Sequence, residues 1–117
     1  MATVFVNGPR IARSSEKITT LTSSTGLTLA KYDLYITTNP PYDQVRHAVA
    51  AAIQVLAAAI KWTTDGTAPT ATAGTGIGFI SNPGDIIVIE GYENIGKFRA
   101  INEVASSGSG LYVEYYF

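Results

Sequence analysis

The chain has 117 residues, 15% of them charged, and a net charge of −1, which fits one domain with a modest core. It has no cysteine, which excludes disulfide bonds, thiolate nucleophiles and cysteine-ligated metals. The scattered charges form no basic stripe for a nucleic-acid backbone. The longest apolar-rich stretch, residues 48–60, is too short and too rich in alanine to span a membrane. We therefore expect neither nucleic-acid nor membrane partners.

Residues 1–26 are predicted to be an N-terminal arm or an edge strand. The run Val4-Phe5-Val6 is followed at once by the breaker Asn7-Gly8-Pro9 and then by a stretch rich in Ser and Thr. The opening MATVFVNGPR lacks the charged and apolar regions of a signal peptide. Such a segment can order against a partner instead of joining a core of its own.

Residues 27–37 show the alternation of a strand, because the side chains at 30, 32, 34 and 36 fall on one face. Asn39-Pro40-Pro41 then ends any regular element, since proline donates no hydrogen bond to a ladder. We expect a strand over 27–37 and a break after it.

Residues 43–62 fit two structures. Apolar residues at spacings of three and four, behind a possible cap at Asp43, favour a helix near 43–60. The alternative is two strands, one at 51–55 and the next from Ile60 to Trp62, with a bend at the small residues 57–59. The sequence leaves both interpretations open, since propensity is easily overridden by tertiary context.

The C-terminal half is typical of short strands between turns. Asp65-Gly66 indicates a turn, and Asn82-Pro83-Gly84-Asp85 has the residues of a type II turn. The β-branched run 86–89 predicts a strand buried on both faces. Strands at 98–104 and 111–117 flank SSGSG, which predicts a hairpin, and the last strand alternates on one face. That face contains Leu111, Val113, Tyr115 and Phe117.

These elements predict an all-β fold, a small antiparallel β-sandwich or partly open barrel with an N-terminal arm. Residues 27–117 would form a single β-rich domain. The alternative is an α+β fold with a helix near residues 43–60.

The residues that could carry chemistry form no recognisable catalytic pattern. His47 is the only histidine, so it can build neither a zinc site nor, without a nucleophile motif, a catalytic triad. The glycines at 74, 76 and 78 have the wrong spacing for a phosphate loop, and no Lys-Ser/Thr follows. Carboxylates such as Glu90 and Glu93, or Asp33 and Asp43, could pair only by chance. We expect no catalytic residue, metal or cofactor.

Seven tyrosines are the remaining feature that could serve recognition. Exposed tyrosines stack on sugars or anchor interfaces, although strand alternation predicts that many simply pack on sheet faces. If the protein binds a carbohydrate or receptor, we expect some of Tyr35, Tyr42 and Tyr112 to form an exposed platform.

An ordered set of motifs carries a resemblance to known proteins. Residues 60–74 read IKWTTDGTAPTATAG, and Asn82-Pro83-Gly84-Asp85, Phe98-Arg99-Ala100-Ile101 and finally Val113-Glu114-Tyr115-Tyr116 follow. This order resembles a diffuse group of small virion proteins encoded among tailed-phage structural genes. The resemblance covers residues 45–117 and implies an all-β domain with strands over residues 45–62.

The resemblance implies a capsid decoration (cement) protein that binds the major capsid protein of the assembled phage head and catalyses nothing. It implies a homotrimer on the capsid exterior, assembled in the host cytoplasm. The alternative is a carbohydrate- or receptor-binding module of a tail or fibre. In the decoration role we expect the apolar residues of the N-terminal segment to touch a neighbour, and four residues near 62–69 to determine the fold instead of forming a binding site. The first set is Val4, Phe5, Val6 and Ile11, and the second is Trp62, Asp65, Gly66 and Pro69.

Overall fold

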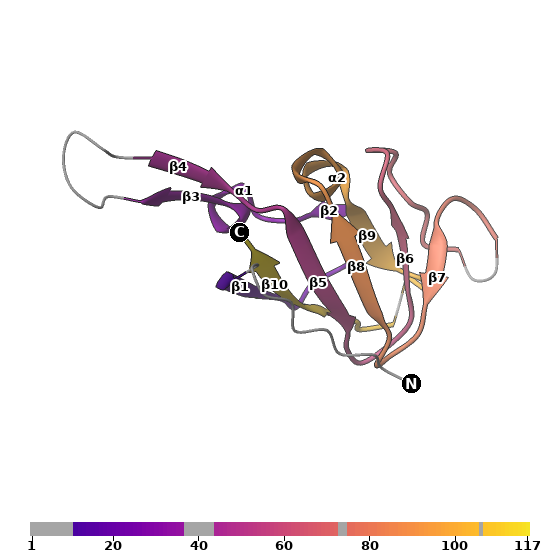
Figure 1. Ribbon diagram of the computed structural model, residues 1–117. Coiled ribbons are helices and arrows are strands. Elements are labelled where there is room, and N and C mark those ends of the chain that lie inside the picture. Colours follow the sequence, from indigo (N-terminus) through magenta and orange to yellow (C-terminus); the bar gives the residue numbers. More distant parts are fainter. Residues whose placement is uncertain (1–10, 37–43, 73–74, 106) are drawn as a thin grey trace.

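The structure is a computed structural model that describes residues 11–36, 44–72, 75–105 and 107–117 (Figure 1). It is a small antiparallel β-sandwich, which confirms the predicted all-β class. Sheet A has the strand order β1-β10-β5-β8 and sheet B the order β2-β9-β6-β7, while β3 and β4 form a separate hairpin. The elements are β1 (Ala12–Ile18), β2 (Thr25–Gly26), α1 (Leu29–Tyr32), β3 (Asp33–Ile36), β4 (Gln44–His47), β5 (Ala50–Val55), β6 (Ile60–Thr63), β7 (Phe79–Ser81), β8 (Ile86–Glu90), α2 (Tyr92–Lys97), β9 (Arg99–Asn102) and β10 (Leu111–Tyr116).

The core lies between the two sheets and is built from the alternation that the sequence shows. On β10, Leu111, Val113 and Tyr115 are buried while Tyr112 faces outward, as the period of two predicts. Ile53 of sheet A and Ile60 of sheet B belong to the same buried cluster. The predicted inward face of the last strand is therefore confirmed.

The ambiguous segment 43–60 forms strands, so the helix alternative is wrong. Ala51, Ile53 and Val55 alternate into the core along β5, and the bend before β6 falls in residues 56–59. β5 is an interior strand that pairs with β10 on one side and β8 on the other. Its backbone hydrogen bonds and its buried face outweigh the helix preference of its alanines.

The prediction of one strand over 27–37 is wrong in its first half. Residues 29–32 form the short helix α1, whose first turn closes with a hydrogen bond from Lys31 N to Thr28 O at 2.9 Å. The turn places Tyr32 in the core, where its ring lies 5.9 Å from the rings of both Tyr92 and Tyr115. The strand β3 begins only at Asp33.

The predicted hairpin around SSGSG is also wrong, although both strands exist. β9 pairs with β2 and β6 in sheet B, whereas β10 pairs with β1 and β5 in sheet A. The connection therefore crosses from one sheet to the other. Ser109 N donates to Asn102 Oδ1 at 3.1 Å, and a Cβ at Gly110 would lie 2.6 Å from Ile18 O. Glycine is needed here for a close backbone approach and not for a tight hairpin turn.

The run 86–89 is buried on one face only, which corrects the prediction of a strand buried on both. Ile87 and Ile89 are in the core, but Val88 is 46% exposed. β8 is an edge strand of an antiparallel sheet whose outer face is open, so β-branched residues occur on both faces without both being buried.

The turn that joins β7 to β8 has the predicted type II geometry. Asp85 N donates to Asn82 O at 3.0 Å, and Gly84 has a φ of +89°, which a glycine adopts without strain. Asn82 N also donates to Asp85 Oδ2 at 2.8 Å. The turn carries the chain from sheet B to sheet A.

The carboxylate of Glu16 links β1 to the turn before α1 and to β10. Glu16 of β1 accepts hydrogen bonds from Thr28 N at 3.1 Å and from Thr28 Oγ1 at 2.6 Å. The hydroxyl of Tyr115 donates to the same carboxylate. Burial, and then the neighbouring Glu16, raise the pKa of Tyr115 above its ordinary value. Both oxygens of the Glu16 carboxylate thus accept hydrogen bonds, from the turn before α1 and from β10.

Candidate protein interface

Three of the four residues expected at a partner interface, Val4, Phe5 and Val6, lie outside the described residues. The fourth, Ile11, is exposed. Its carbonyl accepts a hydrogen bond from Phe117 N at 3.0 Å, which places it beside the end of β10. An exposed isoleucine at this position is compatible with the expected contact, which stays a prediction.

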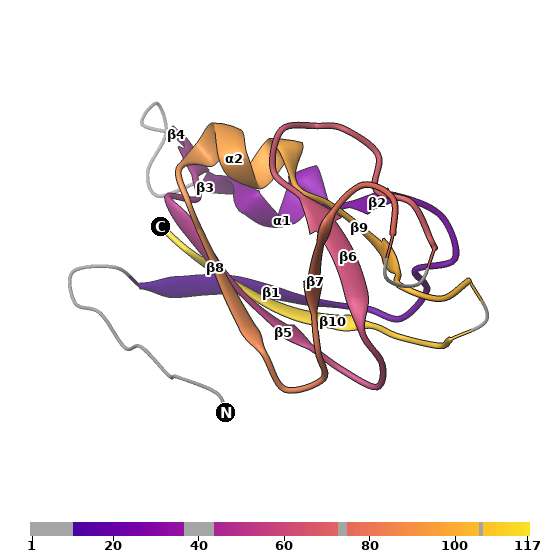
Figure 2. The ribbon, with the colours of Figure 1, turned by 90° about the vertical axis from the view of Figure 1, so that its right-hand side faces the viewer.

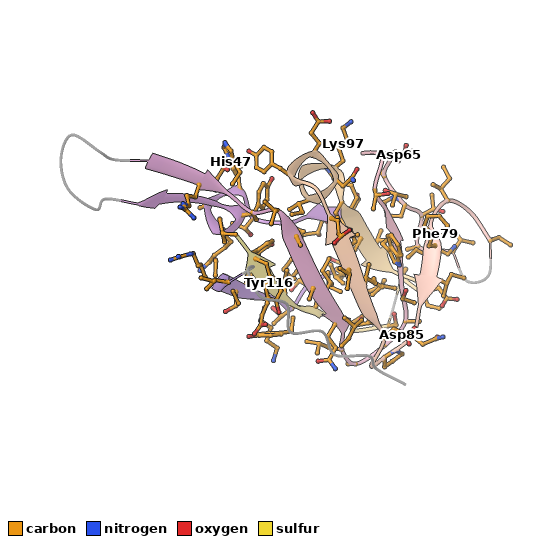
Figure 3. All side chains as sticks on the ribbon, in the orientation of Figure 1. His47, Asp65, Phe79, Asp85, Lys97 and Tyr116 are labelled. Carbon is orange, nitrogen blue, oxygen red and sulfur yellow. The ribbon has the colours of Figure 1, made fainter. Side chains whose placement is uncertain are left out.

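The strongest apolar surface lies elsewhere, at the free edge of sheet B. Phe79 is 65% exposed, Ile77 48% and Ile80 47%. We call these three residues the β7 patch, in which Phe79 lies on the face of Trp62 and Ile80 on the face of Lys61. Among the described residues β7 is the outermost strand of its sheet, so in that part of the chain one side of its backbone has no partner strand. Large apolar side chains on an unpaired edge are the usual signature of a surface that pairs with another chain. Figure 3 labels Phe79 at this edge of the molecule.

Aromatic stacking connects the β7 patch to the core. The rings of Phe79 and Trp62 are 5.0 Å apart, and Trp62 in turn stacks on the buried Phe98 at 6.0 Å. The indole nitrogen of Trp62 donates to Ser81 Oγ at 2.9 Å, which ties β6 to β7. Phe79 is therefore held in position by its inner face while its outer face stays exposed.

A buried lysine holds the long loop between β6 and β7. Lys61 is only 1% exposed, and its ammonium group donates hydrogen bonds to the backbone carbonyls of Thr72 and Thr75. Figure 2 shows this loop at the same end of the sandwich as α2. A buried ammonium group must be hydrogen-bonded, and here loop carbonyls are its partners. The lysine thus fastens the loop to the outer face of sheet B.

Two glycines allow the loop to approach the sheet so closely. Gly78 has a φ of +126°, and a Cβ there would lie 3.0 Å from Lys61 Cβ. Gly76 has a φ of +86°, and its Cβ would lie 2.0 Å from Thr70 Oγ1. Thr70 Oγ1 instead accepts a hydrogen bond from Ile77 N at 2.8 Å. Gly76 and Gly78, two of the three glycines whose spacing does not fit a phosphate loop, position Ile77 and the start of β7.

The residues expected to determine the fold lie at the base of this loop. Asp65 Oδ1 accepts from Thr67 N at 2.9 Å, and this backbone hydrogen bond lowers the pKa of Asp65. Gly66, with a φ of +86°, donates its N–H to Lys97 O at 3.1 Å. Pro69, within the loop, is buried. These contacts shape the turn that leads into the Lys61-fastened loop.

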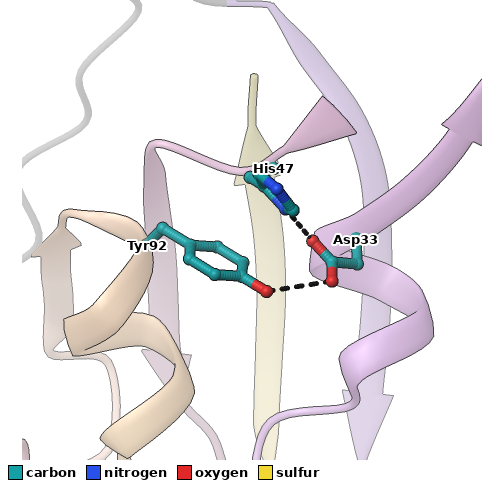
Figure 4. A network of polar contacts seen from close by, with 3 residues as sticks. All are labelled: Asp33, His47 and Tyr92. Carbon is teal, nitrogen blue, oxygen red and sulfur yellow. Dashed lines mark hydrogen bonds and ion pairs between the residues drawn. The ribbon is translucent and has the colours of Figure 1, made fainter. Parts of the chain in front are cut away.

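A polar network joins the β3–β4 hairpin to the body of the protein (Figure 4). Asp33 and His47 are directly opposed on the two strands, and their side chains form a hydrogen bond through His47 Nδ1. Tyr92 of α2 donates its hydroxyl to Asp33 Oδ2 at 2.9 Å, and its ring lies 4.4 Å from the imidazole. The hydrogen bond from His47, and then that from Tyr92, lower the pKa of Asp33.

The Asp33–His47 pair has the first two parts of a catalytic triad. A triad also needs a hydroxyl or thiol in hydrogen-bond contact with the imidazole. In the described ranges no serine or threonine hydroxyl hydrogen-bonds to His47. What the network does is fix the base of the hairpin. Residue types that could form such a network are common in any sequence. Only the register of β3 and β4 shows that Asp33 and His47 lie opposite each other.

Among the described residues, no group of three or more His, Asp or Glu side chains could hold a metal ion. Within that same part of the chain, no helix has the length and apolar character to cross a membrane.

The tyrosines divide between the core and one open sheet face. Tyr32 and Tyr115 are buried, whereas the side chains of Tyr35 and Tyr42 lie outside what the structure describes. Tyr112 is exposed on the outer face of β10, where it and Tyr116 both donate their hydroxyls to Glu114, at 3.4 and 3.0 Å. Of the three tyrosines proposed as a platform, Tyr112 thus lies on an open face.

Comparison of the chain with protein-family models, with curated proteins and with solved structures gives no match.

Proposed function

We propose that this protein is a structural module without catalytic activity, a capsid decoration protein that binds the exterior of an assembled tailed-phage head. The β7 patch is the observation that supports this proposal most directly. Its apolar residues Ile77, Phe79 and Ile80 are exposed at the outermost strand of sheet B among the described residues, where a neighbouring chain can add a strand. The order of motifs in residues 45–117 supplies the specific assignment to a phage head.

The geometry of the β7 patch suits attachment to a rigid lattice. Lys61 and the glycines of the loop hold Ile77 in place, and Trp62 supports Phe79. Preorganised side chains lose less conformational entropy on binding, so affinity per contact is higher. With a net charge of −1, attachment would depend on shape and apolar contact more than on charge.

The N-terminal residues Val4, Phe5 and Val6, with Ile11, are proposed as a second contact with the major capsid protein or with a neighbouring copy. A homotrimer follows from the resemblance, and a three-fold arrangement would multiply weak contacts. Light scattering over a range of concentrations checks this part. A concentration-independent trimer supports it, and a monomer both in solution and on capsids contradicts it.

Binding to capsids that lack the protein tests the proposal. The wild-type chain should co-sediment with assembled capsids and not with free coat protein. Phe79→Ser and Ile80→Lys, which alter the β7 patch, should weaken binding about tenfold or more, since anchor residues of an interface contribute over 1 kcal/mol each. Val88→Lys, an equally exposed apolar position on the edge of sheet A, is the matched control and should bind normally. Wild-type protein that does not bind such capsids would refute the decoration role.

A second candidate function is supported by the outer face of β10. Tyr112 and Tyr116 flank Glu114, an arrangement of aromatic rings around a hydrogen-bonding carboxylate that suits a sugar. In that case the protein would be a carbohydrate- or receptor-binding module of a tail or fibre. A glycan array should then show binding that Tyr112→Ala abolishes, and an array without binding would count against it.

A further inference from the structure

An open surface pocket of about 660 Å³, which we call the Arg13–Lys31 cavity, is lined by the start of β1, the helix α1 and Glu114. Its polar wall is formed by Arg13 and Ser15 of β1, Lys31 of α1 and Glu114 of β10. Figure 1 shows these three elements gathered at one end of the sandwich, on the side away from β7. The cavity is thus separate from the β7 patch.

A β-bulge presents Arg13 to this cavity. Along the β1–β10 ladder, Ala12 pairs with Tyr116 and Ser14 with Tyr115, so Arg13 is the extra residue that has no partner in the ladder. A bulge changes the direction of a side chain on an edge strand, and bulges are frequent beside binding sites. Lys31 reaches the same cavity from the last turn of α1.

The two cations at the cavity have no anionic partner. Within the described ranges, the side chains of Arg13 and Lys31 form no hydrogen bond or ion pair. Glu114, the acid on the same wall, accepts from the hydroxyls of Tyr112 and Tyr116 with its two oxygens. Two positive charges and one negative charge therefore face the cavity, which leaves one positive charge unbalanced.

We infer that the Arg13–Lys31 cavity binds a single carboxylate group, supplied by an Asp or Glu side chain of a protein partner. One monoanion balances the charge of the cavity, whereas a phosphate dianion would leave one negative charge in excess. Arginine offers a carboxylate two parallel N–H donors, and Lys31 and the Ser15 hydroxyl can donate to the same group. The carboxylate chemistry stands by itself, while the identification of its source as the capsid protein rests on the proposed function.

Titration of the isolated full-length chain, followed by NMR, tests the carboxylate chemistry. The probe is N-acetylglutamate N-methylamide, and N-acetylglutamine N-methylamide is its neutral counterpart, both at constant ionic strength. Amide signals of residues 12–15 and 30–31 should shift saturably with the acidic probe and not with the neutral one. Absence of saturable shifts, equal shifts with both probes, or tighter binding of inorganic phosphate would each overturn the inference.

Variants of the two cations provide the second readout. Arg13→Gln and Lys31→Gln should each weaken binding of the acidic probe about three- to fivefold, the range for an exposed charge pair. Glu114→Gln, which removes a repelling charge, should strengthen it. Lys17→Gln is the matched control, because Lys17 is an exposed cation of the same strand outside the cavity. An equal loss with Lys17→Gln would reveal nonspecific attraction and overturn the inference.

Capsid binding by the same variants identifies the source of the carboxylate. If the capsid protein supplies it, Arg13→Gln and Lys31→Gln should weaken capsid binding by a similar factor. Normal capsid binding by both variants would overturn this part. If the wild-type chain does not bind capsids at all, the decoration role fails while the titration with the acidic probe still decides the carboxylate site.

Discussion

Two projecting elements are fastened to the sandwich in opposite ways. The β6–β7 loop is held by Lys61, a buried cation whose hydrogen-bond partners are neutral backbone carbonyls. The β3–β4 hairpin is held by Asp33, an accessible carboxylate whose partners are His47 and Tyr92. The first attachment depends on shape and on buried hydrogen bonds. The second depends on ionisation, so solution conditions should affect the two regions differently.

The difference matters for the proposed interface. The β7 patch lies on the region whose attachment through Lys61 uses backbone carbonyls, which do not titrate, and acid acts on this loop through Asp65 at its base. A surface that attaches by apolar contact benefits from a support that keeps its shape when salt or pH changes. The hairpin network is the region where we expect sensitivity.

The largest effect should come from Gly78→Ala. The new Cβ would crowd Lys61 Cβ at 3.0 Å and Pro69 Cβ at 3.2 Å, at a φ of +126° that side chains rarely adopt. Strain and crowding together should lower the free energy of unfolding by about 2–4 kcal/mol. Urea denaturation measures this. Gly108→Ala is the control, since nothing lies near its added Cβ, and it should change the value by less than about 0.5 kcal/mol.

Lys61→Met should have the next largest effect. Methionine keeps the apolar stem but leaves the carbonyls of Thr72 and Thr75 without a donor, which should cost about 1–3 kcal/mol in the free energy of unfolding. Proteolysis within residues 64–78 should also become faster. Lys17→Met, at an exposed lysine, serves for comparison. Unchanged stability and unchanged proteolysis would show that the ammonium group does not fasten the loop.

Asp33→Asn should show its effect only in the pH dependence of stability. The pKa of Asp33 is lower in the folded than in the unfolded chain, so its ionised form stabilises the fold above the unfolded value, about pH 4. This contribution is lost as the pH falls through the folded pKa. The wild-type Tm should exceed that of Asp33→Asn by about 1–2 °C at neutral pH, and the gap should close in acid. A constant gap would contradict this explanation.

Tyr92→Phe should have the smallest effect on stability. It removes one of the hydrogen bonds that lower the pKa of Asp33, so this pKa should rise, as followed by carboxyl ¹³C NMR. His47→Gln should raise it further, because the histidine hydrogen bond is the largest cause of the shift. The reverse order would contradict the role assigned to His47. The β6–β7 loop should be unaffected by either substitution.

Local sequence patterns predicted those strands and turns whose structure does not depend on which other strands pack beside them. The alternation of Leu111, Val113 and Tyr115 and the turn at 82–85 are read directly from residue types, and both are confirmed. Alanine-rich β5 could not be decided locally, since its structure depends on having β10 and β8 on either side. The prediction of a hairpin between β9 and β10 was wrong for a similar reason. The sheet that a strand joins depends on partners distant in the sequence.

The candidate sites were harder to predict from the sequence than the strands and turns. Phe79 and Ile80 are visible as a short apolar strand after glycines, but their exposure follows from β7 being an edge strand. Arg13 and Lys31 line the same cavity because of a bulge in β1 and the short helix α1, and no local sequence pattern predicted either feature. The expected contacts of Val4, Phe5 and Val6 stay predictions.

The pairing of β1 with β10 has a consequence for biosynthesis. β10 lies between β1 and β5 but follows all three other strands of sheet A in the chain, so it is synthesised after them. Until residues 111–116 emerge, β1 and β5 lack the strand that joins them in the folded protein, whereas β6, β7 and β9 of sheet B can already pair. Pairings between such distant residues form slowly and expose strand edges meanwhile. Translation that stalls before residue 111 should therefore yield an aggregation-prone intermediate, and a peptide with the sequence of β10, supplied in trans, should rescue it.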